Sequence, residues 1–258
     1  MDLELKGQKI IVTAGANGIG LEIARAFVRE GAHVVVCDVD RDALAALSQS
    51  DPSLKAHYCD VADRTQVASF FDSALKELGG LDCLVNNAGI AGPTGRVEAI
   101  NPDDWERCIA VCLTSQFNCA RIAIPHLRKS QNPSIVNLSS AAGKFGFAMR
   151  APYAAAKWGV IGFTKSLSIE LGEDRIRVNA ILPGLVSGDR QRRVLEARAQ
   201  QRGMSFKDTE AAAFSYTSIK DYVTPQQIAD QIVFIASPRG KTISGQAISV
   251  DGDTRMLG

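Results

Sequence analysis

A tyrosine and a lysine stand four positions apart at Tyr153 and Lys157, in the sequence YAAAK. Residues four apart on a helix share one face and lie one turn from each other. A free phenol is a sluggish base near neutral pH, but a neighbouring ammonium group stabilises the phenolate. This spacing therefore predicts a phenol that can take up or release a proton at working pH.

A glycine-rich turn near the start of the chain, VTAGANGIG, follows an apolar run and leads into a helical pattern that begins at Gly18. The first amide groups of a helix have no partner within it, and the positive end of its dipole suits a pyrophosphate. We expect Gly18 and Gly20 to permit a close backbone approach where a Cβ atom would clash. From the turn alone, a tight strand-to-helix connection without a ligand is the alternative.

An aspartate, Asp38, ends the second apolar run eighteen residues after Gly20. At about this offset, an acid meets the ribose hydroxyls of a bound dinucleotide and repels a 2′-phosphate. Residues 12–20 contain no lysine or arginine, and Arg41 is the only base nearby. Asp38 could instead start the next helix, although Asp40 is better placed as its N-cap. These positions favour NAD over NADP.

The elements that must hold these residues are apolar runs alternating with longer amphipathic segments. Continuous runs of Val, Ile and Leu predict strands buried on both faces, and the segments with a period of about 3.6 residues predict helices. The pattern predicts one α/β domain over 1–258: a doubly wound, Rossmann-type, seven-stranded parallel sheet with helices on both faces, joined by right-handed crossovers. The helices are expected at 18–30, 41–49, 64–78, 102–130, 153–171 and 225–237. A polar stretch at 187–219 is a candidate lid because it follows the sixth strand.

The composition of the chain disfavours several classes of binding partner. The net charge is +1 over 258 residues, and no basic run would neutralise many phosphates, so nucleic acid and anionic membrane are poor partners. No apolar stretch approaches the roughly 20 residues needed to span a bilayer, and the start lacks a signal-peptide pattern, which predicts a cytoplasmic protein. Neither the histidines nor the cysteines have metal-ligand spacing, so we expect no metal and reduced, mostly buried thiols. The cysteines are Cys37, Cys59, Cys83, Cys108, Cys112 and Cys119.

Three further motifs accompany YAAAK and the glycine turn: NNAG at 86–89, the pair Ser139-Ser140, and Pro183-Gly184. In this order the chain closely resembles the short-chain dehydrogenase/reductase family over essentially its whole length. The resemblance implies that Tyr153 is the general acid/base and that Lys157 tunes it and holds the nicotinamide ribose. It also implies that Ser140 hydrogen-bonds the substrate oxygen.

The resemblance carries the cofactor contacts over position by position. Asn87, Ala88 and Gly89 resemble the segment beside the adenosine ribose, and Asp60 and Val61 resemble the pair that flanks adenine. Asp60 could instead cap a turn, although Asp63 with Gln66 fits that cap better. The expected cofactor-binding residues are Gly15, Asn17, Gly18, Ile19, Gly20, Asp38, Asp60, Val61, Asn87, Ala88, Gly89, Tyr153, Lys157, Pro183, Gly184 and Val186.

Three positions depart from the family pattern. Ala14 replaces a glycine of the first turn, which an alanine with negative φ would tolerate. Cys112 stands where the family has its fourth catalytic residue, an asparagine thought to hold a water of a proton relay, and a thiol is a poorer hydrogen-bond partner. Gly188 stands where a threonine often contacts the nicotinamide amide.

The expected function is an NAD-dependent oxidoreductase that acts on a small secondary alcohol or ketone, such as a sugar, polyol or hydroxy acid. A 3-ketoacyl reductase using NADPH is the first alternative, and a dinucleotide-binding protein without catalysis is another. A hydrolase using Ser139 or Ser140 would lack a G-x-S-x-G elbow. The family is mostly tetrameric through the helices at 102–130 and 153–171 and the last strand, so we expect a homotetramer.

The substrate is the least determined feature, because the lid sequence points two ways. Arginine suits bidentate recognition of an anionic or polyhydroxylated substrate, and Arg190 or Arg193, nearest the strand end, would be the binding residue. A solvated helix face or a subunit contact is the alternative for these arginines. The lid arginines are Arg190, Arg192, Arg193, Arg198 and Arg202, and the apolar residues that could line a pocket for a steroid or acyl chain are Phe145, Phe147, Met149, Met204 and Phe206.

Overall fold

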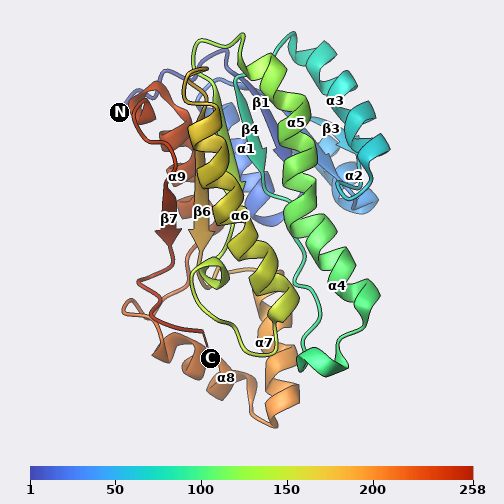
Figure 1. Cartoon of the computed structure of the whole chain (residues 1–258), viewed down its shortest axis with the longest axis vertical. Coiled ribbons are helices and arrows are strands. Elements are labelled where there is room, and N and C mark those ends of the chain that lie inside the picture. Colours follow the sequence, from blue (N-terminus) through green and yellow to red (C-terminus); the bar gives the residue numbers. More distant parts are fainter. Residues whose placement is uncertain (258) are drawn as a thin grey trace.

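Seven apolar runs form one parallel sheet in the computed structural model, which describes residues 1–257. The strand order is β3-β2-β1-β4-β5-β6-β7, so the order reverses between β1 and β4 (Figure 1). The expected doubly wound α/β fold is confirmed. The strands are β1 (Lys9–Thr13), β2 (His33–Asp38), β3 (Lys55–Tyr58), β4 (Cys83–Asn86), β5 (Ser134–Leu138), β6 (Arg177–Pro183) and β7 (Ala247–Val250).

The helices begin and end close to the positions that the sequence predicts, because their caps are local. Asp40 and Asp63 accept backbone N–H groups at the starts of α2 and α3, and Gly31, with φ of 81°, follows the end of α1. The helices are α1 (Gly18–Arg29), α2 (Arg41–Ser50), α3 (Arg64–Leu78), α4 (Pro102–Ile109), α5 (Ser115–Leu127), α6 (Ala151–Glu170), α7 (Asp189–Arg202), α8 (Phe206–Ser215) and α9 (Pro225–Ala236). Shorter turns are η1 (Val97–Ala99), η2 (Ala110–Thr114), η3 (Ala141–Gly143) and η4 (Pro238–Gly240).

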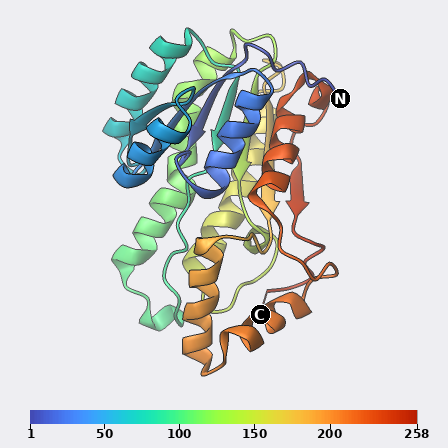
Figure 2. The same cartoon turned by 180° about the vertical axis from the view of Figure 1, so that it is seen from behind.

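Helices cover both faces of the sheet. One apolar core joins alternate strand residues to α1, α2 and α9 and includes Phe27 of α1. A second core joins the other strand residues to α3, α5 and α6 and includes Phe71 of α3. Figures 1 and 2 show these two layers from opposite sides. The inner strands of the sheet are therefore buried on both faces, and their ends present the residues that follow them.

One connection differs from the expected right-handed crossovers. From β5 to β6 the chain passes through α6, on the face shared with α3 and α5, whereas from β6 to β7 it passes through α9, on the opposite face beside α1. Both steps run in the same direction across the sheet, so the second has the opposite hand. The cause is the long excursion through α7 and α8, which lets the chain reach the other face before α9 begins.

The helix expected at 102–130 runs from Pro102 to Leu127 with a π-helical turn, η2, in its middle. By length and composition alone, this 26-residue span could cross a membrane, because an 18-residue apolar window within it has a mean hydropathy of 1.3. This differs from the expectation that no stretch is long enough. Half of the apolar window is buried inside the fold. Core helices pass the same test, so the span is weak evidence for a membrane segment.

The polar stretch at 187–219 forms two helices, α7 and α8, beyond the carboxyl ends of the strands (Figure 1). Its two ends are tied together, because Ser187 N–H donates to Val223 and Val223 N–H donates to Leu185. Near the chain end, Thr254 pairs with Thr217 and Leu257 pairs with Phe147. The candidate lid is therefore a compact helical unit fastened at its root.

Candidate active site

The glycine turn after β1 is held by contacts that assign different roles to its glycines. The Asn87 side-chain amide donates to the Thr13 and Ala14 carbonyls at 3.0 and 2.9 Å. A Cβ on Gly20 would lie 2.1 Å from the Ala14 oxygen, whereas a Cβ on Gly18 would meet no atom within 4 Å. Gly20 therefore lets α1 pack against the turn. Gly18, with φ of 54°, leaves open space at the helix start.

Ala14 does not keep the negative φ that its tolerance was expected to require. Its φ is 52°, in the left-handed region that disfavours a Cβ atom. The two hydrogen bonds from Asn87 hold the peptide in this conformation. The turn is therefore strained at the position where the family has a glycine.

Asp38 ends β2 directly beside this turn and is 9% exposed. One carboxylate oxygen accepts the Ala16 N–H at 3.1 Å, and the other accepts the N–H groups of Val39 and Asp40. A carboxylate has about four acceptor positions, so these bonds leave capacity for one more. The carboxylate braces the turn and still offers an acceptor at the strand end, while Asp40 caps α2.

The adjacent strand ends place the remaining expected cofactor residues along the same edge. Thr13 Oγ1 accepts the N–H groups of Asn87 and Ala88 at 3.0 and 3.1 Å, which fixes the segment after β4. Asp60 accepts the Ala62 N–H and pairs with Arg107 at 2.9 Å, so its side chain also organises its own turn. After β6, a Cβ on Gly184 would lie 2.7 Å from the Asp251 Cα. Pro183 is the last residue of β6, and Val186 pairs with Val223.

Tyr153 and Lys157 lie one turn apart on α6, as the spacing predicts. Lys157 is 3% exposed, and its Nζ donates to the Leu138 carbonyl at the end of β5 at 2.8 Å. The ammonium lies 5.7 Å from the centroid of the Tyr153 ring. A buried ammonium is thereby fixed beside a half-buried phenol.

The two serines after β5 have separate roles. Ser139 is buried and donates to the Lys157 carbonyl at 2.8 Å, so it fastens α6 to the sheet. Ser140 is partly exposed and accepts the Ala142 N–H at 3.2 Å, which leaves its hydroxyl hydrogen available to another acceptor. Of the pair, Ser140 can therefore meet a bound molecule. An active-site serine at position 139 would have to break its helix contact.

Cys112 lies in the π-helical turn η2, and its sulfur contacts both backbone polar atoms of Ile90 at 3.4 Å. Its pKa is lowered to about 5, first because the Cys108 thiol donates to it, and further by Lys157 and the Ile90 N–H, against the effect of burial. A Cβ on Gly89 would lie 3.4 Å from Lys157 Nζ and 3.8 Å from Cys112 Sγ. A thiol with a lowered pKa is thus placed close to the buried ammonium where the family has a neutral amide.

Among the lid arginines, Arg190 reaches the site: it donates to the Gly89 carbonyl at 3.1 Å. Arg193 is exposed, and Arg192 pairs with Glu196 on the same helix. The sequence reasoning missed Arg150, which is 4% exposed and lies 5.3 Å from the Tyr153 ring. In a sequence, an isolated arginine before a helix is typical of a solvated helix cap. The only signal that could have identified Arg150 was its position three residues before Tyr153.

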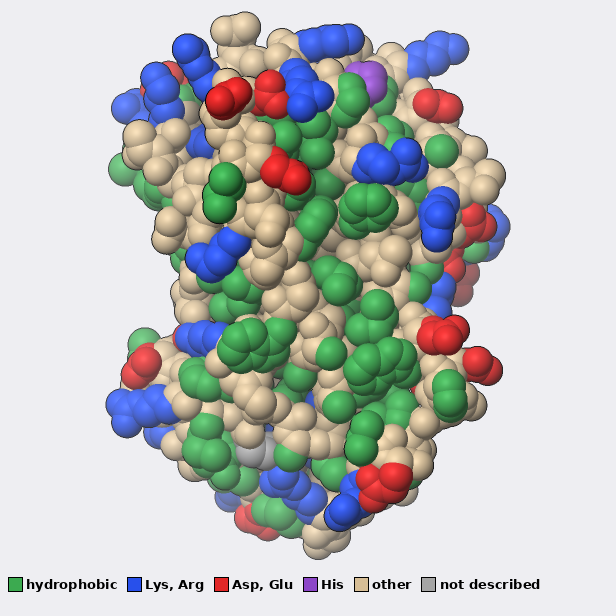
Figure 3. Space-filling model, in the orientation of Figure 1, with side chains coloured by type: hydrophobic (Ala, Val, Ile, Leu, Met, Phe, Trp, Pro, Cys, Tyr) green, Lys and Arg blue, Asp and Glu red, His purple; other side chains and the backbone are tan. Residues whose placement is uncertain are grey.

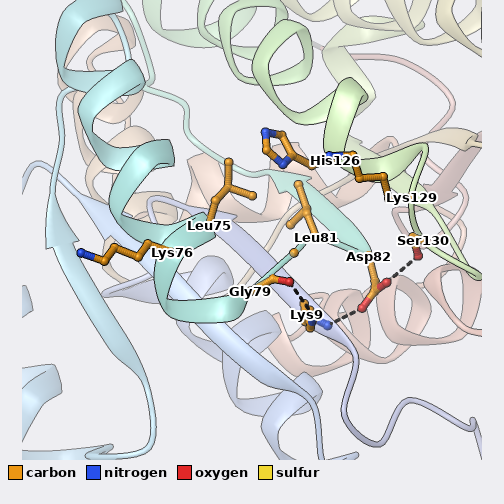
Figure 4. Close-up of a pocket in the computed structure, with 10 residues that line it drawn as sticks. Lys9, Leu75, Lys76, Gly79, Leu81, Asp82, His126, Lys129 and Ser130 are labelled. Atoms are coloured by element: carbon orange, nitrogen blue, oxygen red, sulfur yellow. Dashed lines mark hydrogen bonds between the residues drawn. The ribbon is translucent and has the colours of Figure 1, made fainter.

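A separate hollow lies at the amino ends of β1 and β4, on the opposite edge of the sheet from these residues (Figure 4). Asp82 accepts the Lys9 N–H at 2.8 Å and the Ser130 hydroxyl, and Lys9 Nζ donates to the Gly79 carbonyl. Both oxygens of this carboxylate are used within the protein. The hollow is a structural corner of the sheet rather than part of the site.

Comparisons with known proteins agree with this geometry. A family model described as enoyl-(acyl carrier protein) reductase matches residues 13–253. The chain is 32% identical over 254 residues to the 3-oxoacyl-(acyl-carrier-protein) reductase FabG of Thermotoga maritima, covering 97% of this chain and 98% of that protein. It is 32% identical over 253 residues to the D-beta-hydroxybutyrate dehydrogenase of Cupriavidus necator, covering 96% and 98%. A crystal structure of an actinorhodin polyketide ketoreductase with NADPH is 30% identical, covers 95% of this chain and 96% of its own, and has a TM-score of 0.89.

Proposed function

The chain belongs to the short-chain dehydrogenase/reductase family and is an oxidoreductase that acts on CH–OH groups. Within that family, we propose that it uses NAD to oxidise a small secondary alcohol: a sugar, a polyol or a hydroxy acid. The observation that carries the proposal is the buried Lys157 ammonium fixed beside Tyr153, at the strand edge where the glycine turn and Asp38 also lie.

The residues at this edge fit a dinucleotide. The start of α1 is open at Gly18, where an added Cβ would meet no atom within 4 Å, and free amides at a helix start suit phosphate oxygens. Asp38 retains an acceptor position for ribose hydroxyls and would repel a 2′-phosphate. Arg41, the only nearby base, stacks at 3.8 Å over the Tyr58 ring instead of facing Asp38. These features support NAD rather than NADP.

When bound, NAD would supply an acceptor for the hydride that leaves the substrate carbon. The protein's own residues handle the proton and the charge. Tyr153 takes the proton from the substrate hydroxyl, and the Lys157 ammonium stabilises the phenolate that accepts it. Ser140 donates a hydrogen bond to the substrate oxygen, where charge develops. We propose oxidation as the direction because cellular NAD is kept oxidised.

A reductase for 3-ketoacyl thioesters that uses NADPH is the second candidate. It is favoured by the similarity to the Thermotoga maritima reductase and to the ketoreductase structure with NADPH. This candidate requires a 2′-phosphate close to Asp38, and Arg41 would have to leave Tyr58 to neutralise it. We also propose that the protein acts in the cytoplasm as a homotetramer.

The test is a comparison of cofactors followed by a substrate screen. Purified protein is melted with NAD and with NADP, and a ligand at one hundred times its Kd is expected to add about 2.7 kcal/mol of stability. NAD reduction is then followed over sugars, polyols and hydroxy acids. Stronger protection by NADP, with reduction of a 3-ketoacyl thioester, would favour the second candidate. Protection by NAD without reduction by any alcohol would indicate a dinucleotide-binding protein without catalysis.

A further inference from the structure

Arg150 is a buried cation with incomplete hydrogen bonding directly beside the catalytic tyrosine. It is 4% exposed, one of its terminal nitrogens donates to the Ala91 carbonyl, and its Nε has no hydrogen-bond partner among the described residues. Its guanidinium lies 5.4 Å from the Phe147 ring and 5.3 Å from the Tyr153 ring. Burying a charged group without full pairing costs several kcal/mol, so such a group is a candidate for binding a ligand.

Two arginines of α7 approach the same place from the lid. Arg198 lies 5.4 Å from the Phe147 ring, so Arg150 and Arg198 both contact one aromatic side chain. Arg190, at the start of the helix, donates to the Gly89 carbonyl. The pKa of Arg150 is lowered first by burial and also by the charge of Arg190, and the pKa of Arg198 is lowered by burial and by its arginine neighbours. Arg150 therefore lies close enough to both Arg190 and Arg198 for their charges to interact with its own.

No carboxylate neutralises this group within residues 1–257. The ion pairs of the described chain include none of Arg150, Arg190 and Arg198. On α7 itself, Glu196 pairs with Arg192, whose side chain is 73% exposed. The buried Lys157 adds a further positive charge near Tyr153. The Cys112 thiol, whose pKa is lowered to about 5, has Cys108 as its hydrogen-bond partner and lies near Lys157.

We propose that Arg150 and Arg198 form a subsite that binds the carboxylate of the substrate, so that the substrate is a short hydroxy acid. Resting on the proposed function, this inference narrows the substrate class from sugars, polyols and hydroxy acids to hydroxy acids. A guanidinium binds a carboxylate through two parallel N–H groups, and the free Nε of Arg150 is one of the donors such a pair uses. Because Arg150 lies only 5.3 Å from the Tyr153 ring, few bonds separate the carboxylate from the reacting CH–OH carbon.

The sequence favoured Arg190 or Arg193 as the residue that binds the substrate, whereas the proposed subsite consists of Arg150 and Arg198. Arg193 is exposed, whereas Arg150 precedes the lid altogether and comes from the loop before α6. Arg190 contacts the Gly89 carbonyl, in the segment expected beside the cofactor, so its hydrogen bond serves closure of the lid. The subsite is therefore shared between a fixed residue, Arg150, and a lid residue, Arg198. Substrate binding then favours the closed lid, because the carboxylate bridges the two.

The wild-type experiment compares a charged and a neutral form of one molecule. 3-Hydroxybutanoate and its methyl ester share the reacting carbon and differ in the charge at the subsite. We expect kcat/KM for the acid to exceed that for the ester at least about tenfold, since a charge-assisted hydrogen bond to a buried arginine is a strong interaction. Butanoate, which has no hydroxyl group to oxidise, should raise the melting temperature of the protein in the presence of NAD.

The variants test the two arginines separately. Arg198→Met and Arg150→Met should each reduce the acid-to-ester ratio of kcat/KM at least about tenfold and remove the protection by butanoate. Arg150→Lys should retain part of the preference for the acid and part of the protection by butanoate, because lysine keeps the positive charge. Arg192→Met is the matched control on the same helix, and its ratio should equal that of the wild type.

The outcomes separate the two proposals. If NAD reduction occurs with neutral alcohols but wild type shows no preference for the acid, the subsite is wrong and the proposed function stands. An equal loss for acid and ester in Arg198→Met would also overturn the subsite. If no alcohol is oxidised but butanoate still protects wild type and not Arg198→Met, the proposed function fails while the anion subsite holds. Arg198 is only partly buried, so its variant stays informative if Arg150→Met fails to fold.

Discussion

Single side chains at the candidate site are positioned by backbone carbonyls at the strand ends. The Leu138 carbonyl fixes the Lys157 ammonium, and the Lys157 carbonyl in turn accepts the Ser139 hydroxyl. Because β5 is buried in the centre of the sheet, these acceptors cannot move independently of it. The phenol of Tyr153 therefore meets a charge whose position the sheet defines, as preorganised electrostatic stabilisation requires.

Tyr153→Phe tests the proton-transfer assignment. The change removes one hydroxyl group, so kcat for the best alcohol should fall at least about a hundredfold, within the usual range for loss of a general acid/base. NAD should still raise the melting temperature, because the ring and Lys157 remain. Near-normal turnover by the purified variant, measured as NAD reduction, would contradict the assignment.

Asp38→Asn tests cofactor choice. Removing the negative charge removes the repulsion of a 2′-phosphate, so the ratio of NAD to NADP affinity should fall about tenfold or more. Titration of both cofactors by protein fluorescence measures this ratio. Asp40→Asn is the control, because asparagine caps a helix as well as aspartate and the side chain does not touch the turn. An unchanged ratio in Asp38→Asn would show that Asp38 only braces Ala16.

The residues that sequence could predict are those whose partners are local or follow from the strand order. Asp38 and Asn87 follow strand ends that the apolar runs already define, and both lie where they were expected. The expectation of a negative φ at Ala14 was wrong, because this φ depends on hydrogen bonds from Asn87, seventy-three positions away. Arg150 was missed because its burial arises only when the loop before α6, the lid and the chain end come together.

At the scale of elements, the π-helical turn η2 shows how a substitution is accommodated. The turn inserts an extra residue into the helix at Cys112 and directs its sulfur to the Ile90 backbone. π-helical turns occur frequently at functional sites. The helix thus keeps polar contacts with Ile90, the residue that follows the NNAG segment, although a thiol replaces an amide. The 3.6-residue apolar pattern of the sequence gives no sign of this turn, because the apolar positions continue through it.

Arg25→Met tests how α1 is fastened to the end of α2. Arg25 donates to both Asp51 oxygens, at 2.9 and 2.8 Å, and its loss should lower the free energy of unfolding by about 1 kcal/mol at neutral pH, since the pair is partly exposed. The hydrogen bonds from Arg25 lower the pKa of Asp51 in the folded state. The stabilisation is thus present above the unfolded carboxyl pKa of about 3.9 and is lost as pH falls through the lower folded value.

Urea unfolding of wild type and Arg25→Met over a series of pH values measures this effect. The difference in unfolding free energy should be constant between about pH 5 and pH 7 and should shrink below about pH 4. Arg192→Met, which removes a more exposed pair within one helix, should cost less than half as much. A difference that grows on acidification would rule out this explanation.

Element boundaries were largely predictable because caps and glycine stops are local signals. The structure differs from the sequence prediction where long-range packing determines the arrangement. Examples are the hand of the connection from β6 to β7 and the two helices of the lid. α7 has only Leu195 and Ala199 buried, so its apolar pattern is too sparse to identify a helix from sequence. The hand follows from α9 packing against α1, which no local pattern encodes.

At the scale of the whole molecule, the layer formed by α4, α5 and α6 presents apolar side chains to solvent. Figure 3 shows hydrophobic groups gathered over this face. Phe117 of α5 is 49% exposed, and Trp158 of α6 is 52% exposed. Trp105 of α4 and Ile169 of α6 are 38% and 81% exposed. Several large apolar side chains exposed on one face are typical of an interface between subunits.

Trp158→Glu and Phe117→Glu test whether these helices join subunits. In the proposed tetramer, each substitution would bury a charge in an apolar contact, so the sedimentation coefficient should fall from that of about four chains to that of two or one. Val97→Glu is a matched control, because Val97 is 67% exposed in the short turn η1 before α4 and outside the proposed contact. Circular dichroism of each variant checks that the fold persists. If wild type sediments as a monomer, or if both charged variants remain tetrameric, this face is not the interface. Retained NAD protection in dissociated Trp158→Glu would further show that each chain binds its cofactor alone, as expected when all expected cofactor contacts come from one chain.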